Sequence, residues 1–424
     1  MTKIKFIHAS DLHIESPYQG ISGMNRELGD ALIRLGHKSY KNLIDLCIDE
    51  QADFLIISGD SFDSASGSLG AMFSFFNGLR RLEKNSIKVY IICGNHDPFT
   101  AWSETFTLPE NVTLFSPDKV NYELFTKEGK PQASVYGISY REREEWRPLA
   151  REFNREDSAP FSIAVLHGTL TGRDAHIPYS PFDLSTIRKK DFDYWALGHV
   201  HQHEVISESD PLAVYPGNLQ GRHFNETGEK GCCMVEVTGG KVSDLQFIPL
   251  SEVVFLYHSA DITGVEGVTG LFSRLNDIKN EIAERERGSV MLRIELKGRT
   301  GLFSILGDHD EMEKLTAEIN RENDYSGRFI YTDRIINNTK PHIDLEERKR
   351  SSDLVADLLN RFDSYRNDSS RLEELREKIL SEIKSSRAGK YLDKEGESCD
   401  LQEVLDNAKW KCIGGLIPDK DKGV

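Results

Sequence analysis

Short apolar runs alternate with longer stretches of helical periodicity over the first hundred residues. The runs at 3–8, 53–58 and 87–92 are rich in β-branched residues and predict buried strands. Between them, apolar residues three or four positions apart predict two helices. One apolar face comprises Leu43, Ile44, Leu46 and Cys47, and the other Leu69, Met72, Phe73, Phe76 and Leu79. Strands alternating with helices indicate an α/β layered domain.

A second group of short apolar runs lies at 162–166, 194–197, 213–215 and 232–237. We expect these four runs to form a second sheet, so that two sheets make a sandwich with helices outside. The predicted fold class is therefore α/β, with a layered β-sandwich core flanked by helices.

The pattern changes after about residue 250. Expected strands at 253–258, 290–297 and 328–333, with helices near 266–285 and 310–322, predict a small α+β domain. Two amphipathic stripes follow. They comprise Leu354, Val355, Leu358, Leu359 and Phe362, then Leu372, Leu375, Ile379 and Ile383. Their apolar faces either pack on their own domain or dock on a partner. The predicted division is 1–250, 251–345, 346–390 and a C-terminal tail at 391–424, of which we expect 414–424 to be loose.

Composition excludes several classes of protein. With 424 residues and 38% apolar content, the chain can bury a sizeable core. No apolar segment approaches the roughly 20 residues needed to span a bilayer, and we expect a cytoplasmic protein without a membrane. The six cysteines form no Cys-x-x-Cys pair, which argues against a thiolate zinc site. The net charge of −16 argues against a generally adhesive nucleic-acid coat but permits a local basic track.

Five short polar motifs stand where expected strands end, which is where α/β folds gather binding residues. They are Asp11-Leu-His13, Gly59-Asp60, Gly94-Asn95-His96-Asp97, His167-Gly168 and Gly198-His199-Val-His201. Each alone is common in turns or surface loops, whereas the ordered set of five is specific.

The residue types in these motifs suit a metal centre. In an extended segment residues i and i+2 point to the same side, so Asp11 with His13, and His199 with His201, can each present two donors to one cleft. Carboxylate and amide oxygens with imidazole nitrogens, and no thiolate, suit Mn²⁺, Fe²⁺, Zn²⁺ or Mg²⁺. We expect two divalent ions, with Mn²⁺ as the first choice. Glycines beside the ligands permit sharp turns and close backbone approach.

This ordered set resembles the calcineurin-like metallophosphoesterases, and more narrowly the branch of SbcD-type DNA repair exonucleases and the bacterial YhaO-like proteins. The resemblance covers about residues 1–250. It is carried by His8-Ala-Ser-Asp-Leu-His13, Gly94-Asn-His-Asp-Pro98, Asp193-Tyr-Trp-Ala-Leu-Gly-His199 and Tyr215-Pro-Gly-Asn-Leu-Gln-Gly-Arg-His223.

The resemblance implies a role for each residue. Asp11, His13 and His201 would hold one metal, Asn95, His167 and His199 the other, and Asp60 would bridge both. His96 would face the scissile phosphate, with Asp97 orienting it. Residues 251–345 would be a capping domain. The following helices would bind an SMC-like ATPase of the SbcC or YhaN kind. Relatives form homodimers through helices of the phosphoesterase domain, and two apolar groups could either form such a surface or pack in the core: Leu32, Ile33 and Leu35, or Leu69, Met72 and Phe73.

As a mechanism, we expect the two ions to supply hydroxide for in-line attack on phosphorus, with His96 as general acid. The substrate would be DNA, cleaved as an exonuclease or endonuclease. Substrate contacts are expected from Arg222 and His223, which lie in the resembling segment, and from Arg173. Further basic candidates are Arg141, Arg143, Arg188, Lys189 and Lys190, although a charge run is usually a solvated helix end. Trp102 and Trp195 are candidates for stacking on a base.

Two other classes of function fit the same motifs. The metal core also serves phosphatases and cyclic-nucleotide phosphodiesterases, because fold does not fix substrate. A non-catalytic scaffold that anchors an ATPase is disfavoured by the completeness of the ligand set.

Overall fold

The computed structural model describes residues 3–16, 18, 26–63, 68–102, 107–172, 177–342, 345–386 and 401–416. The chain divides into two compact units. Unit 1 comprises residues 1–256, 287–291 and 324–329, and unit 2 comprises 257–286, 292–323 and 330–424. The predicted sites and motifs within the described residues all lie in unit 1.

The first sheet of unit 1 has six strands in the order β12-β11-β1-β2-β3-β4. Their bounds are β1 Lys3–Ala9, β2 Phe54–Ser58, β3 Lys88–Ile92, β4 Val112–Leu114, β11 Gly231–Thr238 and β12 Lys241–Pro249. Strands β1 to β4 run parallel to one another. Their carboxyl ends therefore meet at one edge, and the loops that follow them can build one site.

The second sheet has the order β5-β6-β7-β8-β10-β9. Its strands are β5 Asn121–Lys127, β6 Lys130–Gly137, β7 Ser162–His167, β8 Tyr194–Gly198, β9 Glu204–Ser207 and β10 Leu212–Tyr215. Strands β6, β7 and β8 are parallel, with His167 opposite Gly198 in the register.

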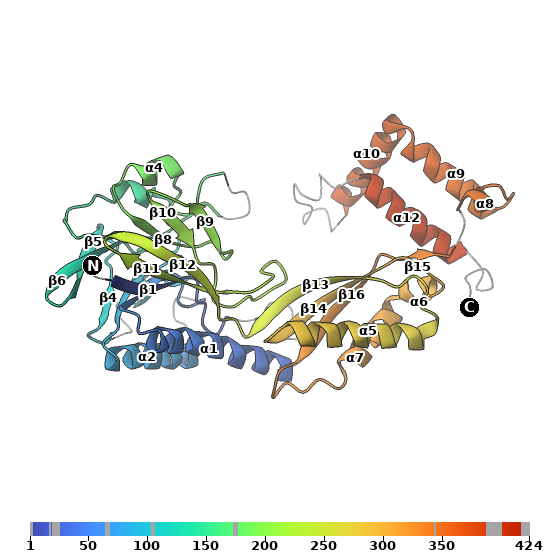
Figure 1. Ribbon diagram of the computed structural model, residues 1–424. Coiled ribbons are helices and arrows are strands. Elements are labelled where there is room, and N and C mark those ends of the chain that lie inside the picture. Colours follow the sequence, from blue (N-terminus) through green and yellow to red (C-terminus); the bar gives the residue numbers. More distant parts are fainter. Residues whose placement is uncertain are drawn as a thin grey trace. The chain divides into compact units, whose positions relative to one another are not determined.

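The two sheets pack face to face with a helix layer on each outer side. Phe6, Phe54 and Ile56 of the first sheet share one buried cluster with Ile163 and Val165 of the second. Helices α1 (Arg26–Asp49) and α2 (Leu69–Lys84) cover the other face of the first sheet, and a short helical turn η1 (Leu149–Glu152) and α4 (Leu184–Arg188) cover that of the second (Figure 1). A four-residue helix, α3 (Phe99–Trp102), follows the third strand. The predicted layered α/β fold class is confirmed.

One detail of the sequence prediction is wrong. The run at 232–237 is not in the second sheet, because β11 pairs antiparallel with β1. The apolar face predicted for the helix at 69–84 is only partly buried, since Leu69 and Phe73 are 73% and 67% exposed. The buried residues of α2 are Ala71, Phe75, Gly78, Leu79 and Leu82.

Unit 2 contains most of a three-stranded sheet in the order β13-β14-β16, and a small parallel pair β15 and β17. The strands are β13 Val253–Asp261, β14 Ser289–Lys297, β15 Arg299–Thr300, β16 Ile330–Asn337 and β17 Lys340–Pro341. The helices are α5 Gly267–Arg285, α6 Phe303–Leu306 and α7 His309–Asn320. These elements agree with those expected at 251–345, while the domain boundary itself stays a prediction.

The C-terminal part of unit 2 is helical. It contains α8 Leu345–Lys349, α9 Leu354–Arg366, α10 Ser369–Ser385 and α12 Leu401–Leu416. Asp368 caps α10 at the expected break, accepting hydrogen bonds from the amides of Ser370 and Arg371. The expected C-terminal tail at 391–424 includes α12, where Trp410 and Ile413 pack against Val355 and Leu359. Residues 391–400 and 417–424 of that tail lie outside the described residues. Among the described helices, none has the length and apolar character needed to cross a membrane.

Candidate metal centre

The five motifs meet at the carboxyl ends of β1, β2, β3, β7 and β8. Asp11 follows β1, Asp60 follows β2, Asn95 follows β3, His167 ends β7, and His199 follows β8. The loops after β1 and β2 are joined by backbone hydrogen bonds, since the amides of Asp11 and His13 donate to the carbonyls of Gly59 and Asp60 at 3.0 and 3.1 Å. Loops distant in sequence are thereby held as one surface.

Four of the predicted ligands have a left-handed backbone. The φ angles of Asp11, His13, Asp60 and His199 are 49°, 41°, 53° and 93°. Such angles are uncommon for residues other than glycine and cluster at functional sites. The pairs Asp11 with His13 and His199 with His201 do converge, but through these turns and not through the extended geometry expected from the sequence.

The first ligand set comprises Asp11, His13 and His201, each of which brings one donor atom within 4.8 Å of the others. His201 Nε2 lies 3.3 Å from His13 Nε2 and 3.5 Å from Asp11 Oδ1. Asp60 Oδ2 lies 3.9 Å from His13 Nε2. All four donors thus face one point.

The second ligand set comprises Asn95, His167 and His199. Asn95 Oδ1 lies 3.1 Å from His167 Nε2 and 3.0 Å from His199 Nδ1. The same Asp60 Oδ2 that faces the first set lies 3.4 Å from His167 Nε2. One carboxylate oxygen therefore stands between the two sets.

The donor atoms fit divalent cations. Asp11 Oδ1 is buried and has no hydrogen-bond partner in the protein, an arrangement that costs free energy unless a cation binds it. Burial alone would raise the pKa of Asp60, but His167 and His13 outweigh it and hold that pKa well below its usual range. Burial would lower the pKa of His167, yet Asp60 and Asp11 raise it to about 9. A cation would bind these ionised carboxylates in place of protons on the imidazoles.

Carboxylates support the histidines of the first set. Glu226 Oε1 lies 2.6 Å from His201 Nδ1, and Asp63 Oδ1 lies 3.2 Å from His13 Nδ1. Arg222 joins the two carboxylates, at 2.8 Å from Asp63 and 3.3 Å from Glu226. A carboxylate behind a metal-binding imidazole fixes its tautomer and raises its basicity. In keeping with this, the negative charges of Asp11 and Glu226 beside the His201 imidazole outweigh burial and raise the pKa of His201 to about 9.

Backbone carbonyls support the histidines of the second set. His167 Nδ1 lies 2.9 Å from the carbonyl of Ser58, and His199 Nε2 lies 3.1 Å from that of Ile177. If each of these nitrogens donates its proton, the opposite nitrogen faces Asn95 with its lone pair.

Four glycines beside the ligands have no room for a side chain. A Cβ on Gly59 would overlap His167 Nδ1, and one on Gly94 would overlap Asp60 Oδ1. A Cβ on Gly168 or Gly198 would overlap the carbonyl of Ser180 or Ser58. These close approaches explain why glycine stands at the positions that the sequence analysis singled out.

His96 lies beside the first set, with its ring centroid 4.9 Å from that of His13 and its side chain 29% exposed. His96 Nδ1 is 3.0 Å from the backbone carbonyl of Asp63, which orients the ring. Asp97, expected to orient it, instead accepts hydrogen bonds from the amides of Gly94 and Ser61 at 3.0 and 2.8 Å. Asp97 therefore holds the loop that carries His96 and does not hold the imidazole itself.

The predicted substrate residues differ in their surroundings. The Arg222 guanidinium is engaged with Asp63 and Glu226 and is 13% exposed, which favours a positioning role over contact with substrate. His223 is 33% exposed, and its Nε2 lies 3.3 Å from Glu226 Oε1. Arg173 lies outside the described residues.

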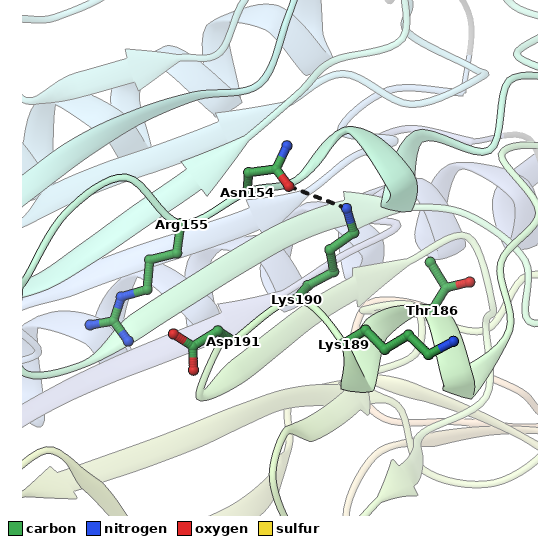
Figure 2. Close-up of a pocket in the computed structure, with 6 residues that line it drawn as sticks. All are labelled: Asn154, Arg155, Thr186, Lys189, Lys190 and Asp191. Carbon is green, nitrogen blue, oxygen red and sulfur yellow. Dashed lines mark hydrogen bonds between the residues drawn. The ribbon is translucent and has the colours of Figure 1, made fainter.

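The basic run at 188–190 does not line the metal cleft. Lys189 and Lys190 border a separate pocket with Asn154, Arg155, Thr186 and Asp191, where Lys190 Nζ approaches Asn154 Oδ1 (Figure 2). Lys189, Lys190 and Asp191 come before β8 in the chain, whereas His199 comes directly after it. The pocket and His199 are therefore separated by the length of that strand, about five residues at roughly 3.3 Å each. The solvated helix end is the better interpretation of this run.

Asp63 and Glu226 were not among the site residues predicted from the sequence. Each follows a motif closely, Asp63 three residues after Asp60 and Glu226 three residues after His223. The signal was available, because metal-binding histidines commonly have a carboxylate or carbonyl partner. The sequence does not indicate which of the chain's 69 acidic residues is that carboxylate partner, because the pairing depends on how the loops fold.

Comparison with known proteins agrees with this geometry. Residues 4–203 match the sequence profile of a family described as calcineurin-like phosphoesterase. The metallophosphoesterase YhaO of Bacillus subtilis is 35% identical over 346 residues, covering 81% of this chain and 84% of that protein. The DNA double-strand break repair protein Mre11 of Methanocaldococcus jannaschii is 25% identical, covering 58% of this chain and 66% of its own length. Mre11 of Sulfurisphaera tokodaii is 26% identical, covering 56% of this chain and 61% of its own length. This chain thus spans less than two thirds of either Mre11 protein.

Proposed function

This chain belongs to the calcineurin-like metallophosphoesterases, which are metal-dependent phosphoesterases, and we propose that it hydrolyses phosphodiester bonds of DNA. The observation that carries the proposal is the position of Asp60, whose Oδ2 lies 3.9 Å from His13 Nε2 and 3.4 Å from His167 Nε2. One carboxylate shared by two ligand sets is the arrangement a two-metal hydrolase needs.

The residues would divide the work as follows. Asp11, His13 and His201 would hold one ion, Asn95, His167 and His199 the other, and Asp60 both. When bound, two divalent ions supply an activated water and neutralise charge on phosphoryl oxygens. Mn²⁺ is our first candidate, with Mg²⁺, Fe²⁺ and Zn²⁺ as alternatives.

His96 would act as the general acid. Because the Asp63 carbonyl accepts the Nδ1 proton, the imidazolium is the form in which Nε2 also carries a proton, which it would donate to the departing sugar oxygen. Its partial exposure beside the first ligand set supports a role toward substrate and not toward metal.

DNA as the substrate is supported by the archaeal relatives, whose name is DNA double-strand break repair protein Mre11. An exonuclease or endonuclease acting in DNA repair in the cytoplasm is the function we propose. A phosphatase or cyclic-nucleotide phosphodiesterase would instead hydrolyse small esters and leave DNA intact.

Two variants test the assignment. Asp60→Ala should lose both ions, whereas His96→Ala should keep both ions and lose turnover by roughly 10²–10⁴-fold. Metal content would be measured beside Mn²⁺-dependent digestion of labelled linear, nicked and hairpin DNA and of bis(p-nitrophenyl) phosphate. Loss of both ions from His96→Ala would contradict its role as the acid. Hydrolysis of the small diester without digestion of any DNA would contradict the proposed substrate.

Protein partners are part of the proposal. In α10, Leu372 is buried while Ile379 is 40% exposed, which supports docking of an SMC-like ATPase of the SbcC or YhaN kind on α9 and α10. Exposed Leu69 and Phe73 on α2 support a homodimer through unit 1. Sedimentation of the purified chain, with and without Leu69→Asp, tests the dimer. A monomer at micromolar concentration in the unaltered protein would exclude it.

A further inference from the structure

Trp146 differs from the other tryptophans in its exposure. All four tryptophans lie within the described residues, and Trp102, Trp195 and Trp410 are 2%, 0% and 8% exposed. Trp146 is 55% exposed. The burial of Trp102 and Trp195 in the core of unit 1 removes both as stacking partners for a base, and leaves one indole open to a ligand.

A chain of ring contacts links Trp146 to the second ligand set. The ring centroids of Trp146 and Tyr179 are 4.9 Å apart, and those of Tyr179 and His199 are 6.0 Å apart. Consecutive nucleotides of a stacked strand rise by roughly 3.4 Å. The indole therefore lies within about three nucleotides of a phosphate at the ligand cluster.

The backbone around Trp146 is held in place. Arg147 and Glu145 pair with each other through two hydrogen bonds, Nε to Oε1 at 2.9 Å and Nη2 to Oε2 at 2.6 Å. The Glu145 carbonyl accepts a hydrogen bond from the Ser180 amide at 2.6 Å. Since Ile177 of the same segment supports His199, the loop of Trp146 and the second ligand set share one support. A preordered ring loses little entropy when a ligand stacks on it.

We propose that Trp146 stacks on an unpaired base of the DNA strand whose phosphodiester lies at the ligand cluster. The inference rests on the proposed function and extends it, because it places a single-stranded or opened strand end at the site. Every base has a π face, so the contact would tolerate any sequence. A fully paired end would first have to open.

The test compares Trp146→Leu, which keeps apolar bulk without an aromatic face, with Trp146→Phe, which keeps a ring. Tyr122→Leu is the matched control, because Tyr122 is 36% exposed and its ring also contacts a tyrosine, Tyr136, with centroids 4.7 Å apart. Substrates are single-stranded oligonucleotides whose three terminal nucleotides at one end carry either bases or tetrahydrofuran abasic residues. Each substrate is prepared in two versions, with the abasic residues at the 5′ end or at the 3′ end.

Trp146→Leu should raise KM for the base-bearing strand by roughly 5- to 100-fold with kcat unchanged, and should leave the abasic strand unaffected. Trp146→Phe should recover most of the loss, and Tyr122→Leu should behave as the unaltered chain. An equal loss on both strands, or no loss on either, overturns the proposal.

Fluorescence gives a second readout that needs no turnover, because the other three indoles are buried. Base-bearing strands should quench the emission that Trp146→Phe removes, and abasic strands should not. Quenching without cleavage of any DNA would sink the proposed function while supporting the base contact. Cleavage of DNA without base-dependent quenching would support the proposed function and overturn the contact between Trp146 and a base.

Discussion

The histidines of the first ligand set are backed by the carboxylates of Asp63 and Glu226, whereas those of the second set are backed by the backbone carbonyls of Ser58 and Ile177. A carboxylate adds charge and can be removed by one substitution. A carbonyl belongs to the fold and moves only when the backbone moves. We therefore expect the two metal positions to respond to different kinds of mutation.

The largest effect should come from Gly198→Ala. The added Cβ would overlap the Ser58 carbonyl and lie 2.8 Å from His167 Nδ1, so the backbone support of the second set must shift. We expect loss of one of two bound ions and a fall in turnover of at least about 100-fold, because small misplacements of ligands are costly. Metal content and turnover of bis(p-nitrophenyl) phosphate measure this.

Gly327→Ala is the control for that substitution, since a Cβ there would meet nothing within 4 Å. Retention of both ions by Gly198→Ala at unchanged affinity would show that the second set does not depend on this carbonyl.

Glu226→Gln should act on the other half of the cluster. Glutamine keeps the shape and can still accept from His201 Nδ1, but it removes the charge that also pairs with Arg222. Affinity for one ion should fall by roughly 10- to 100-fold while the other changes little. Calorimetric titration with Mn²⁺ would resolve the two sites, and Glu229→Gln, an exposed acid on the same loop, is the control. An equal loss of metal affinity at both positions would show that the two ligand sets do not respond differently to this substitution.

The contacts behind the metal-binding histidines also show how much of the site could be predicted from the sequence. Asp11, Asp60, Asn95, His167 and His199 were predictable because each follows a short apolar strand, and parallel strands bring such ends to one edge. Asp63 and Glu226 were not, because their contacts with His13 and His201 join positions 50 and 25 residues apart through loop geometry.

The same limit explains the errors in the fold. Alternation in the run at 232–237 indicates buried faces but not a neighbouring strand, and β11 pairs with β1. Helical periodicity found α2 but only part of its buried side, because Leu69 and Phe73 are exposed. Helix α12 went unpredicted since its weak apolar pattern gains its burial from contact with Val355 and Leu359.

A buried neutral histidine lies behind the carbonyl-backed half, which predicts a pH effect on stability. His8 lies 3.0 Å from both the Tyr194 hydroxyl and Ser58 Oγ, and burial lowers the pKa of His8 to about 3. In the unfolded chain His8 binds a proton below about pH 6.5, whereas in the folded protein it stays neutral down to about pH 3. The contribution of His8 to the free energy of unfolding is therefore complete above pH 6.5 and is lost as the pH falls toward 3. The slope is about 1.4 kcal/mol per pH unit.

Wild-type protein should therefore lose about 2 kcal/mol more than His8→Asn between pH 7 and pH 5. Urea unfolding of metal-free protein at both pH values, followed by tryptophan fluorescence, measures the difference. His309→Asn, at an exposed position on α7, should lose as much as the wild type. Parallel pH profiles for wild type and His8→Asn would refute the buried neutral state.

The smallest effect on metal binding should come from Ser58→Ala, although Ser58 adjoins the second set. Its carbonyl, and not its hydroxyl, contacts His167, and alanine keeps that carbonyl. The hydroxyl bonds to His8 and to the Leu197 carbonyl, so its loss leaves buried groups unpaired and should cost about 1–3 kcal/mol of stability. Metal affinity at both positions should stay within about threefold, because the carbonyl is retained. Glu226→Gln should differ from Ser58→Ala by weakening metal binding at one position. A tenfold loss of metal affinity in Ser58→Ala would mean that the second half, too, depends on a side chain.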